Sequence, residues 1–189
     1  MISAIVAFTR DKRIVGHKNQ MLWHIALDMR KFQRVTERAV CFVGHSTFKS
    51  IQKIFEERNL GPIILPWRQV VILTSKHANE MEAEILNKDY SNCMVARSKK
   101  ESFQKAALFG NENIVVIGGP QIYELFQNEI EKWYATIVDL NLEEGDARLF
   151  EFEPNLNVDG EPIWELVLEE HHPENVPPFT FTEYERVAK

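Results

Sequence analysis

The sequence has only two cysteines among its 189 residues, and neither Cys41 nor Cys93 has the spacing of a metal-binding motif. Both lie in apolar, strand-like surroundings, so we expect reduced thiols in the core of a cytoplasmic protein. No apolar stretch approaches the roughly 18 residues that a membrane-spanning helix needs. The apolar N-terminus, MISAIVAF, lacks the basic residues and cleavage site of a signal peptide, and we interpret it as a first strand.

An excess of positive charge is also missing. Lys and Arg number 22 against 28 Asp and Glu, which gives a net charge of −6. Because phosphate backbones are neutralised by a basic protein face, this balance argues against a nucleic-acid partner. We expect a small-molecule ligand, with no membrane partner and no bound metal. If that ligand is anionic, the cations that hold it must be concentrated at its site.

What the chain does have is an alternation of apolar runs with helix-like segments, without internal repeats. This pattern predicts a single domain over residues 1–189, of α/β class, with a largely parallel sheet covered on both faces. The predicted strands of the first part are SAIVAF, VCFVG, QVVILTS, CMVA and NIVVIGG, and the predicted helices lie around 25–36, 47–58, 79–87, 99–109 and 120–129. The last third, KWYATIVDLNL, IWELVLEEHH and FTFTEYERV, predicts an antiparallel edge of the sheet.

Asp28 lies at the start of a predicted helix, five residues after Trp23 in the segment MLWHIALDMRKF. Phe32 and Val35 follow it at i+4 and i+7, so the three share one helix face. Burial among apolar side chains raises the pKa of a carboxyl group, which suits a residue that handles a proton near neutral pH. The alternative is an ordinary acidic residue stabilised by the helix dipole.

The strand VCFVG is followed by a predicted helix that starts near Thr47, in the segment VGHSTFKSI. Hydroxyls of Thr47 and Ser50, together with free N–H groups at the helix start, suit a phosphate. Alternatively, Ser46 or Thr47 only caps this helix.

Two other strands also end in residues that suit a ligand, at the edge where α/β sheets usually bind them. VVILTSK ends in Thr74, Ser75 and Lys76, which can hold a phosphate monoester or form an ordinary loop. In IVVIGGPQIY, the adjacent Gly118 and Gly119 let the backbone approach a ligand closely, although this is not the G-x-G-x-x-G fingerprint.

In this order and spacing, these segments resemble the dihydrofolate reductase family over essentially the whole chain. The resemblance rests on MISAIVAF, IVGHKNQMLWHIALDMRKF, VGHSTFKSI, VVILTS, IVVIGGPQIYELF, YATIVDLNLEEGDARLF and the closing strand pair. It implies an eight-stranded, mostly parallel sheet with flanking helices and an antiparallel C-terminal edge. It also implies a monomer that reduces 7,8-dihydrofolate to tetrahydrofolate with hydride from NADPH.

The resemblance assigns catalytic roles to three residues. Asp28 matches the carboxylate that binds the pterin and supports protonation at N5, Trp23 the tryptophan that helps to hold a water, and Thr136 the threonine that orients the carboxylate. The implied substrate-binding residues are Ile5, Ala7, Phe32, Ile51, Arg68 and Ile117. Of these, Arg68 would hold the α-carboxylate of the glutamate tail with a bidentate fork, and Arg58, on an inserted segment, competes for this role.

The resemblance also implies an NADPH site along the strand ends. Its residues are Ala7, Val15, Gly16, Met21, Gly44, His45, Ser46, Thr47, Thr74, Ser75, Lys76, Gly118, Gly119, Pro120, Gln121, Ile122 and Tyr123. The Gly118–Gly119 bond resembles the family's cis peptide. Residues 15–21 resemble a mobile loop that closes over the nicotinamide, with Gly16 as a flexible point.

This sequence departs from the family pattern at several positions. Leu22 and Ala26 stand where prolines are common, which predicts a more mobile loop and helix start. His45 and Gln121 stand where cations are found, so a weaker preference for NADPH over NADH is expected unless Lys76 compensates.

Two other functions are compatible with the predicted fold. A reductase that acts on a ribosylated pyrimidine would share the cofactor-binding half of the fold. This function leaves Trp23, Asp28 and Thr136 without a role. A non-catalytic pterin- or nucleotide-binding relative is favoured only by the missing cations at positions 45 and 121.

Overall fold

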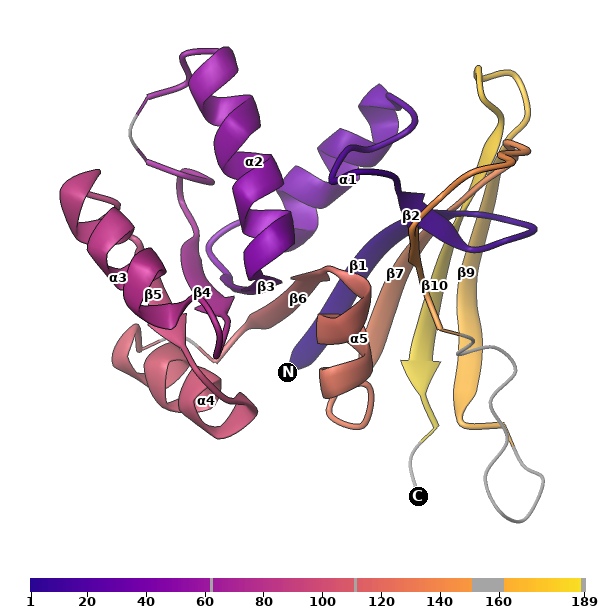
Figure 1. Cartoon of the computed structure of the whole chain (residues 1–189). Helices are drawn as coiled ribbons and strands as arrows, with labels where there is room; N and C mark the ends of the chain where they lie inside the picture. The colour runs from indigo at the N-terminus through magenta and orange to yellow at the C-terminus, as the bar shows by residue number, and fades with distance from the viewer. Residues whose placement is uncertain (62, 111, 151–161, 188–189) are drawn as a thin grey trace.

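The computed structural model describes residues 1–61, 63–110, 112–150 and 162–187. It has α/β architecture, with an eight-stranded sheet whose strand order is β5-β4-β3-β6-β1-β7-β10-β9 (Figure 1). The strands are β1 (Ile2–Thr9), β3 (Val40–Gly44), β4 (Gln69–Leu73), β5 (Cys93–Ala96), β6 (Ile114–Gly118), β7 (Lys132–Val138), β9 (Trp164–His172) and β10 (Phe179–Arg186). The helices are α1 (Ala26–Thr36), α2 (His45–Glu57), α3 (Ala78–Asn87), α4 (Lys99–Leu108) and α5 (Pro120–Phe126).

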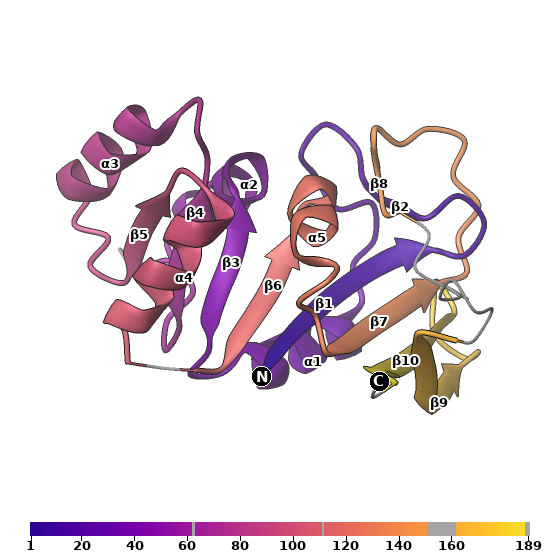
Figure 2. The same cartoon turned by 90° about the horizontal axis from the view of Figure 1, so that it is seen from below.

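The predicted mixture of parallel and antiparallel pairing is confirmed. Strands β5, β4, β3, β6, β1 and β7 pair in parallel, whereas β10 pairs antiparallel with both β7 and β9. The carboxyl ends of the parallel strands therefore meet at one edge of the sheet, as Figure 2 shows. That edge is where the polar and glycine residues identified in the sequence emerge.

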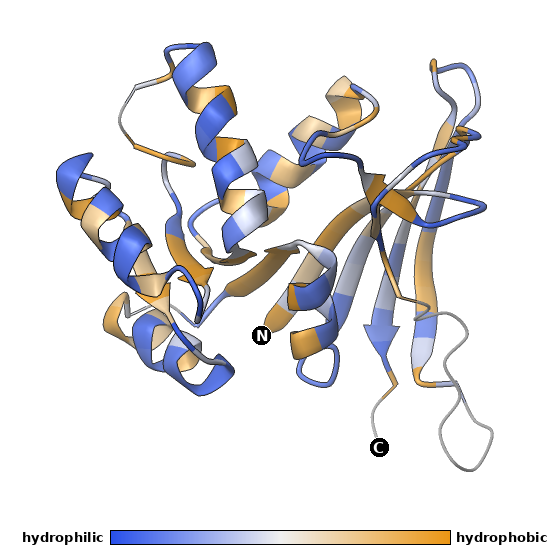
Figure 3. Ribbon diagram, in the orientation of Figure 1, coloured by the Kyte–Doolittle hydropathy of each residue, from blue (hydrophilic) through white to orange (hydrophobic). Residues whose placement is uncertain are grey.

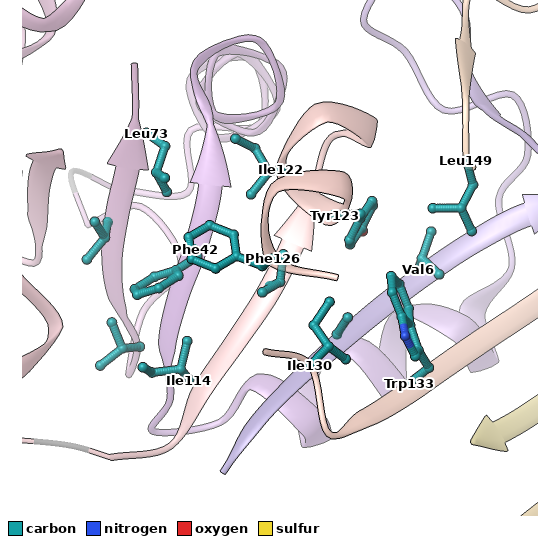
Figure 4. Close-up of a cluster of buried hydrophobic side chains, with 14 of the residues drawn as sticks. Val6, Phe42, Leu73, Ile114, Ile122, Tyr123, Phe126, Ile130, Trp133 and Leu149 are labelled. Atoms are coloured by element: carbon teal, nitrogen blue, oxygen red, sulfur yellow. The ribbon is translucent and has the colours of Figure 1, made fainter. Parts of the chain in front are cut away.

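Alternate residues of the central strands fill two separate cores, one on each face of the sheet. In β3, Val40 and Phe42 join a cluster with side chains of α4 and α5, whereas Cys41 and Val43 join a cluster with side chains of α1, α2 and α3. Figure 4 shows Phe42 close to Phe126 of α5 in the first cluster. Burial on both faces explains why strands such as β6 are apolar almost throughout, which Figure 3 shows in orange.

Both thiols are free and buried, as the sequence predicted. Burial raises the pKa of the Cys41 and Cys93 thiols to about 12, so neither is a thiolate at neutral pH.

Several local predictions were wrong in detail. Helix α2 begins at His45, earlier than predicted, and α5 ends at Phe126. A second, two-stranded sheet was not predicted at all; it pairs β2 (Ile14–Gly16) with β8 (Ala147–Arg148). Strands this short carry no periodic pattern that a sequence could reveal.

Candidate active site

Asp28 and Thr136 meet across the interface between α1 and the sheet. Thr136 lies in β7, in register with Ala7 of β1 on one side and Phe181 of β10 on the other. Its hydroxyl donates a 2.6 Å hydrogen bond to Oδ1 of Asp28, which is only 8% exposed. No other described residue donates a hydrogen bond to this carboxylate. The predicted contact between the two residues is therefore present.

The surroundings of Asp28 favour its protonated form. Burial raises the pKa of the Asp28 carboxyl above its ordinary value, while the hydrogen bond from Thr136 and the charge of Lys31 act in the opposite direction. Asp28 also lies in the first turn of α1, where a helix dipole lowers the pKa of a carboxyl, so the raised pKa reflects burial as the larger influence.

Four of the apolar residues predicted to bind the substrate share one hydrophobic cluster. Ile5 and Ile117 are buried in the same cluster against which Phe32 and Ile51 pack, so strands β1 and β6 and helices α1 and α2 contribute to one apolar wall. Ala7 packs against a different cluster, which contains Trp23. The Trp23 indole N–H is buried and has no hydrogen-bond partner within the described chain. It is thus a donor that a water or ligand can satisfy.

Lys31 was not recognised in the sequence as part of this region. It is 7% exposed, and its ammonium lies 3.2 Å from Glu183 of β10 and 4.5 Å from the centre of the Phe181 ring. Lys132 of β7 also pairs with Glu183, at 3.0 Å. A lysine three residues after Asp28 gives no sequence signal of burial, because its partner is supplied by the last strand.

The raised pKa of Asp28 makes a prediction about stability. A carboxyl whose pKa is higher in the folded state stabilises the protein below the ordinary pKa of 3.8, and this contribution is lost as the pH rises through the folded value. We therefore expect Asp28→Asn to raise the free energy of unfolding at neutral pH, by on the order of 1 kcal/mol, the usual scale for one buried polar group.

Urea unfolding at neutral pH and at about pH 4 tests this, because the advantage of the Asn variant should shrink on acidification. A variant less stable than the parent protein at neutral pH would contradict the prediction.

Arg68, the residue predicted to bind a glutamate tail, is anchored beside the C-terminal end of α1. Its Nε donates to the Thr36 hydroxyl at 2.8 Å, one terminal nitrogen donates to the Pro66 carbonyl at 2.6 Å, and the other donates to the Gln33 carbonyl at 2.7 Å. A guanidinium has five N–H groups, so one remains on each terminal nitrogen. Arg58 is exposed at the C-cap of α2, and its side chain has no hydrogen bond or ion pair to a described residue.

At the strand-end edge, the structure brings two glycine segments against one another. Gly44 is the N-cap of α2 and has no side chain to cap it, so the expected capping by Ser46 or Thr47 is not found. The Gly118–Gly119 bond is cis, as predicted. A Cβ atom on Gly119 would lie 3.0 Å from the Thr47 hydroxyl, so a larger residue there would force the Thr47 side chain to shift.

The other predicted cofactor residues have different environments. Ser46, Ser75, Lys76 and Gln121 are exposed, and His45, Thr47, Gly119 and Pro120 are partly buried. Ile122 and Tyr123 are buried, and the Tyr123 hydroxyl donates to the Ile5 carbonyl at 2.6 Å.

The Thr74 hydroxyl takes part in a hydrogen bond within its own loop. It accepts a hydrogen bond from the backbone N–H of His77, at 3.1 Å. The side chains of Ser75 and Lys76 form no hydrogen bond or ion pair with any described residue, so both are available to bind a ligand.

The predicted loop over residues 15–21 is held at two points. The Lys18 N–H lies 3.1 and 3.0 Å from the two carboxylate oxygens of Asp146, and the Ser50 hydroxyl donates to the Asn19 carbonyl at 2.7 Å. Gly16 is explained by a close approach, because a Cβ there would lie 2.9 Å from the Gln20 carbonyl oxygen. Its predicted flexibility remains a prediction. Met21 is exposed and Val15 packs against the core of the α4 and α5 face.

Asp146 is a functional candidate that the sequence did not reveal, and it can be tested. Asp146→Ala removes both acceptors of the Lys18 N–H, so we expect hydrogen exchange of that amide to accelerate about tenfold, the equivalent of roughly 1 kcal/mol. Glu144→Ala is the matched control, because among the described residues this exposed carboxylate reaches only His17, at 4.0 Å. Unchanged exchange at Lys18 in the Asp146 variant would show that the loop is held by other contacts.

A parallel sheet with glycine and hydroxyl residues at its carboxyl edge, next to a buried carboxylate, is the arrangement of an α/β enzyme that binds its ligands beyond the strand ends. The chain belongs to the dihydrofolate reductase family, whose sequence profile, described as dihydrofolate reductase, matches residues 1–186.

Named relatives agree with this membership. The chain is similar to dihydrofolate reductase HdrB of Haloferax volcanii, with 30% identity over 79% of this chain and 71% of that protein. It is also similar to the dihydrofolate reductases of Bacillus subtilis, with 28% identity over 90% and 83%, and of Haemophilus influenzae, with 27% identity over 90% and 88%.

Membership identifies the protein as an oxidoreductase, with dihydrofolate reduction as the family's activity and a nicotinamide cofactor implied. In the part of the chain that the structure describes, no helix is long and apolar enough to cross a membrane. The same residues contain no cluster of three or more potential metal ligands.

Proposed function

We propose that the protein reduces 7,8-dihydrofolate to 5,6,7,8-tetrahydrofolate with NADPH, and that Asp28 assists protonation of the pterin. The observation that carries this proposal is the buried carboxylate of Asp28, oriented by Thr136 and raised in pKa. A carboxyl group in this environment can bind a cyclic amidine, and its raised pKa brings proton transfer closer to neutral pH.

The residues around Asp28 have separate roles in binding the substrate. Thr136 engages Oδ1, so the remaining oxygen, Oδ2, is the one we assign to the pterin. The unpartnered indole N–H of Trp23 orients a water beside the ring. The apolar wall formed by Ile5, Phe32, Ile51 and Ile117 excludes bulk water and strengthens these polar contacts.

Arg68 is assigned to the glutamate tail of the substrate. The two N–H groups left by its three internal hydrogen bonds lie one on each terminal nitrogen, which is the pair that a bidentate carboxylate contact requires. The internal bonds also fix the guanidinium in place, so little side-chain entropy is lost when the tail binds.

The strand-end residues fit a dinucleotide. The N–H groups at the start of α2 are not capped by a side chain, and Gly118 and Gly119 leave room for backbone contacts that larger residues would block. Bound NADPH would supply hydride to the pterin. Thr47 and the N-terminal turn of α2 would hold the cofactor phosphates, while Ser75 and Lys76 would hold its 2′-phosphate.

The decisive experiment is consumption of NADPH by the purified protein with 7,8-dihydrofolate, followed by absorbance and compared with NADH. A ribosylated aminopyrimidine serves as the alternative substrate. Turnover with dihydrofolate supports the proposal. Turnover only with the pyrimidine would replace it with the other reductase reaction, and saturable binding without turnover would indicate a non-catalytic relative.

A further inference from the structure

Two histidine rings lie stacked at the edge of the sheet that carries the candidate cofactor residues. His45 is the first residue of α2, and His77 lies in the loop between β4 and α3. Their ring centres are 4.5 Å apart, with 17° between the ring planes. Because β3 and β4 pair in parallel with Gly44 opposite Leu73, the segments that follow these strands emerge side by side.

The charges that face the pair come from two helices and one loop. From α2, Lys49 lies one turn after His45, and its ammonium is already paired with Glu84 at 2.7 Å. From α3, Glu80 lies 3.0 Å from Nδ1 of His77. From the loop, Lys76 is exposed and has no ion pair to a described residue.

These surroundings favour the neutral form of His45. Partial burial lowers the pKa of His45 below its ordinary value of 6.5, and His77 and Lys49 lower it further, whereas Glu80 and Glu84 act in the opposite direction. Two neutral imidazoles can stack face to face, but two imidazolium ions in that arrangement repel each other. The pair therefore becomes positively charged only when it takes up a proton, whereas an arginine is charged at every accessible pH.

We propose that the His45–His77 pair reads the 2′-phosphate of the cofactor by taking up a proton when NADPH binds, so that discrimination between NADPH and NADH grows as the pH falls. This inference rests on the proposed function, because it requires the cofactor to bind at this edge. It changes the expectation drawn from the missing cation at position 45, since the positive charge is supplied on binding.

The sign and range of the effect follow from linkage. A dianion next to an imidazole raises the pKa of that imidazole, so the complex holds more protons than the free protein. Affinity for NADPH then rises as the pH falls, by at most about tenfold per pH unit for each proton taken up. The gain ends near about pH 6, where a phosphate monoester itself takes up its second proton. NADH has no 2′-phosphate, so its affinity should stay flat.

Isothermal titration calorimetry of the full chain with NADPH and with NADH tests the proposal, at about pH 6.5 and about pH 8, in two buffers with different ionisation enthalpies. Affinity for NADPH should be about threefold to tenfold higher at the lower pH, with proton uptake near neutral pH. NADH should show neither effect. Comparing the two cofactors removes any contribution from groups that contact the shared parts of the molecule.

Two variants distinguish the pair from its neighbours. The double variant His45→Gln, His77→Gln should lose proton uptake and the pH dependence of NADPH binding. Lys76→Ala is the matched control, since it should weaken NADPH binding by a similar factor at both pH values and keep the proton uptake. Circular dichroism melting checks that each variant is folded.

Equal proton uptake with NADPH and NADH, or full pH dependence in the double histidine variant, would overturn the inference. Dihydrofolate turnover with pH-independent NADPH binding would overturn it while leaving the proposed function intact. Absence of saturable binding of either cofactor, together with no turnover, would overturn both.

Discussion

Asp28→Asn is expected to lower the rate of dihydrofolate reduction at neutral pH by about two to four orders of magnitude, the usual range for loss of a general acid or base. The carboxyl is buried, accepts a 2.6 Å hydrogen bond from Thr136, and has a raised pKa. Asn keeps the shape and can still accept the hydrogen bond, but it cannot carry the proton. The measurement is steady-state turnover with saturating cofactor.

The pH profile adds a second test of the same residue. In the Asn variant, substrate protonated in solution is the remaining proton source, so the residual rate should increase as the pH falls. Asp139→Asn is a matched control, because Asp139 follows β7 on the surface and pairs with Arg10. Near-normal turnover of the Asp28 variant at neutral pH would contradict the assigned role.

Arg68→Lys is expected to raise the Michaelis constant for dihydrofolate by about tenfold to a hundredfold, the equivalent of about 1.4 to 3 kcal/mol for a bidentate charged contact. Lysine cannot reproduce the fork, and it also loses the hydrogen bonds to Thr36, Pro66 and Gln33. The turnover number should change little, because the tail is bound equally in the ground and transition states.

The controls use the substrate and the competing arginine. A pterin substrate without a glutamate tail should not distinguish the Arg68→Lys variant from the parent protein. Arg58→Lys should have little effect, since that side chain is exposed at the end of α2. A larger, tail-dependent loss in the Arg58 variant would exchange the two assignments.

The sequence predicts those parts of the molecule that follow a regular hydrophobic pattern or that match a family motif. Apolar runs predicted the central strands correctly because burial on both faces leaves no room for polar residues, as β3 illustrates. The contact between Asp28 and Thr136 came from the resemblance, because no local pattern links residues that lie 108 positions apart.

What the sequence could not predict depends on contacts between segments that are distant along the chain. The burial of Lys31 requires Glu183, the loop anchor at Lys18 requires Asp146, and the stacked histidines require two parallel strands to end together. The start of α2 was also misplaced, because a glycine at the N-cap carries weaker information than a serine or threonine one or two residues later.

The position of β7 has a consequence for how the protein is made. The strand that carries Thr136 lies between β1 at the beginning of the chain and β10 near its end. During synthesis, β7 keeps an open edge until residues 179–186 have left the ribosome, and open edges favour association with other chains. Long-range pairings of this kind also slow folding. The nascent chain therefore exposes the strand that carries Thr136 along one edge until β10 emerges and covers it.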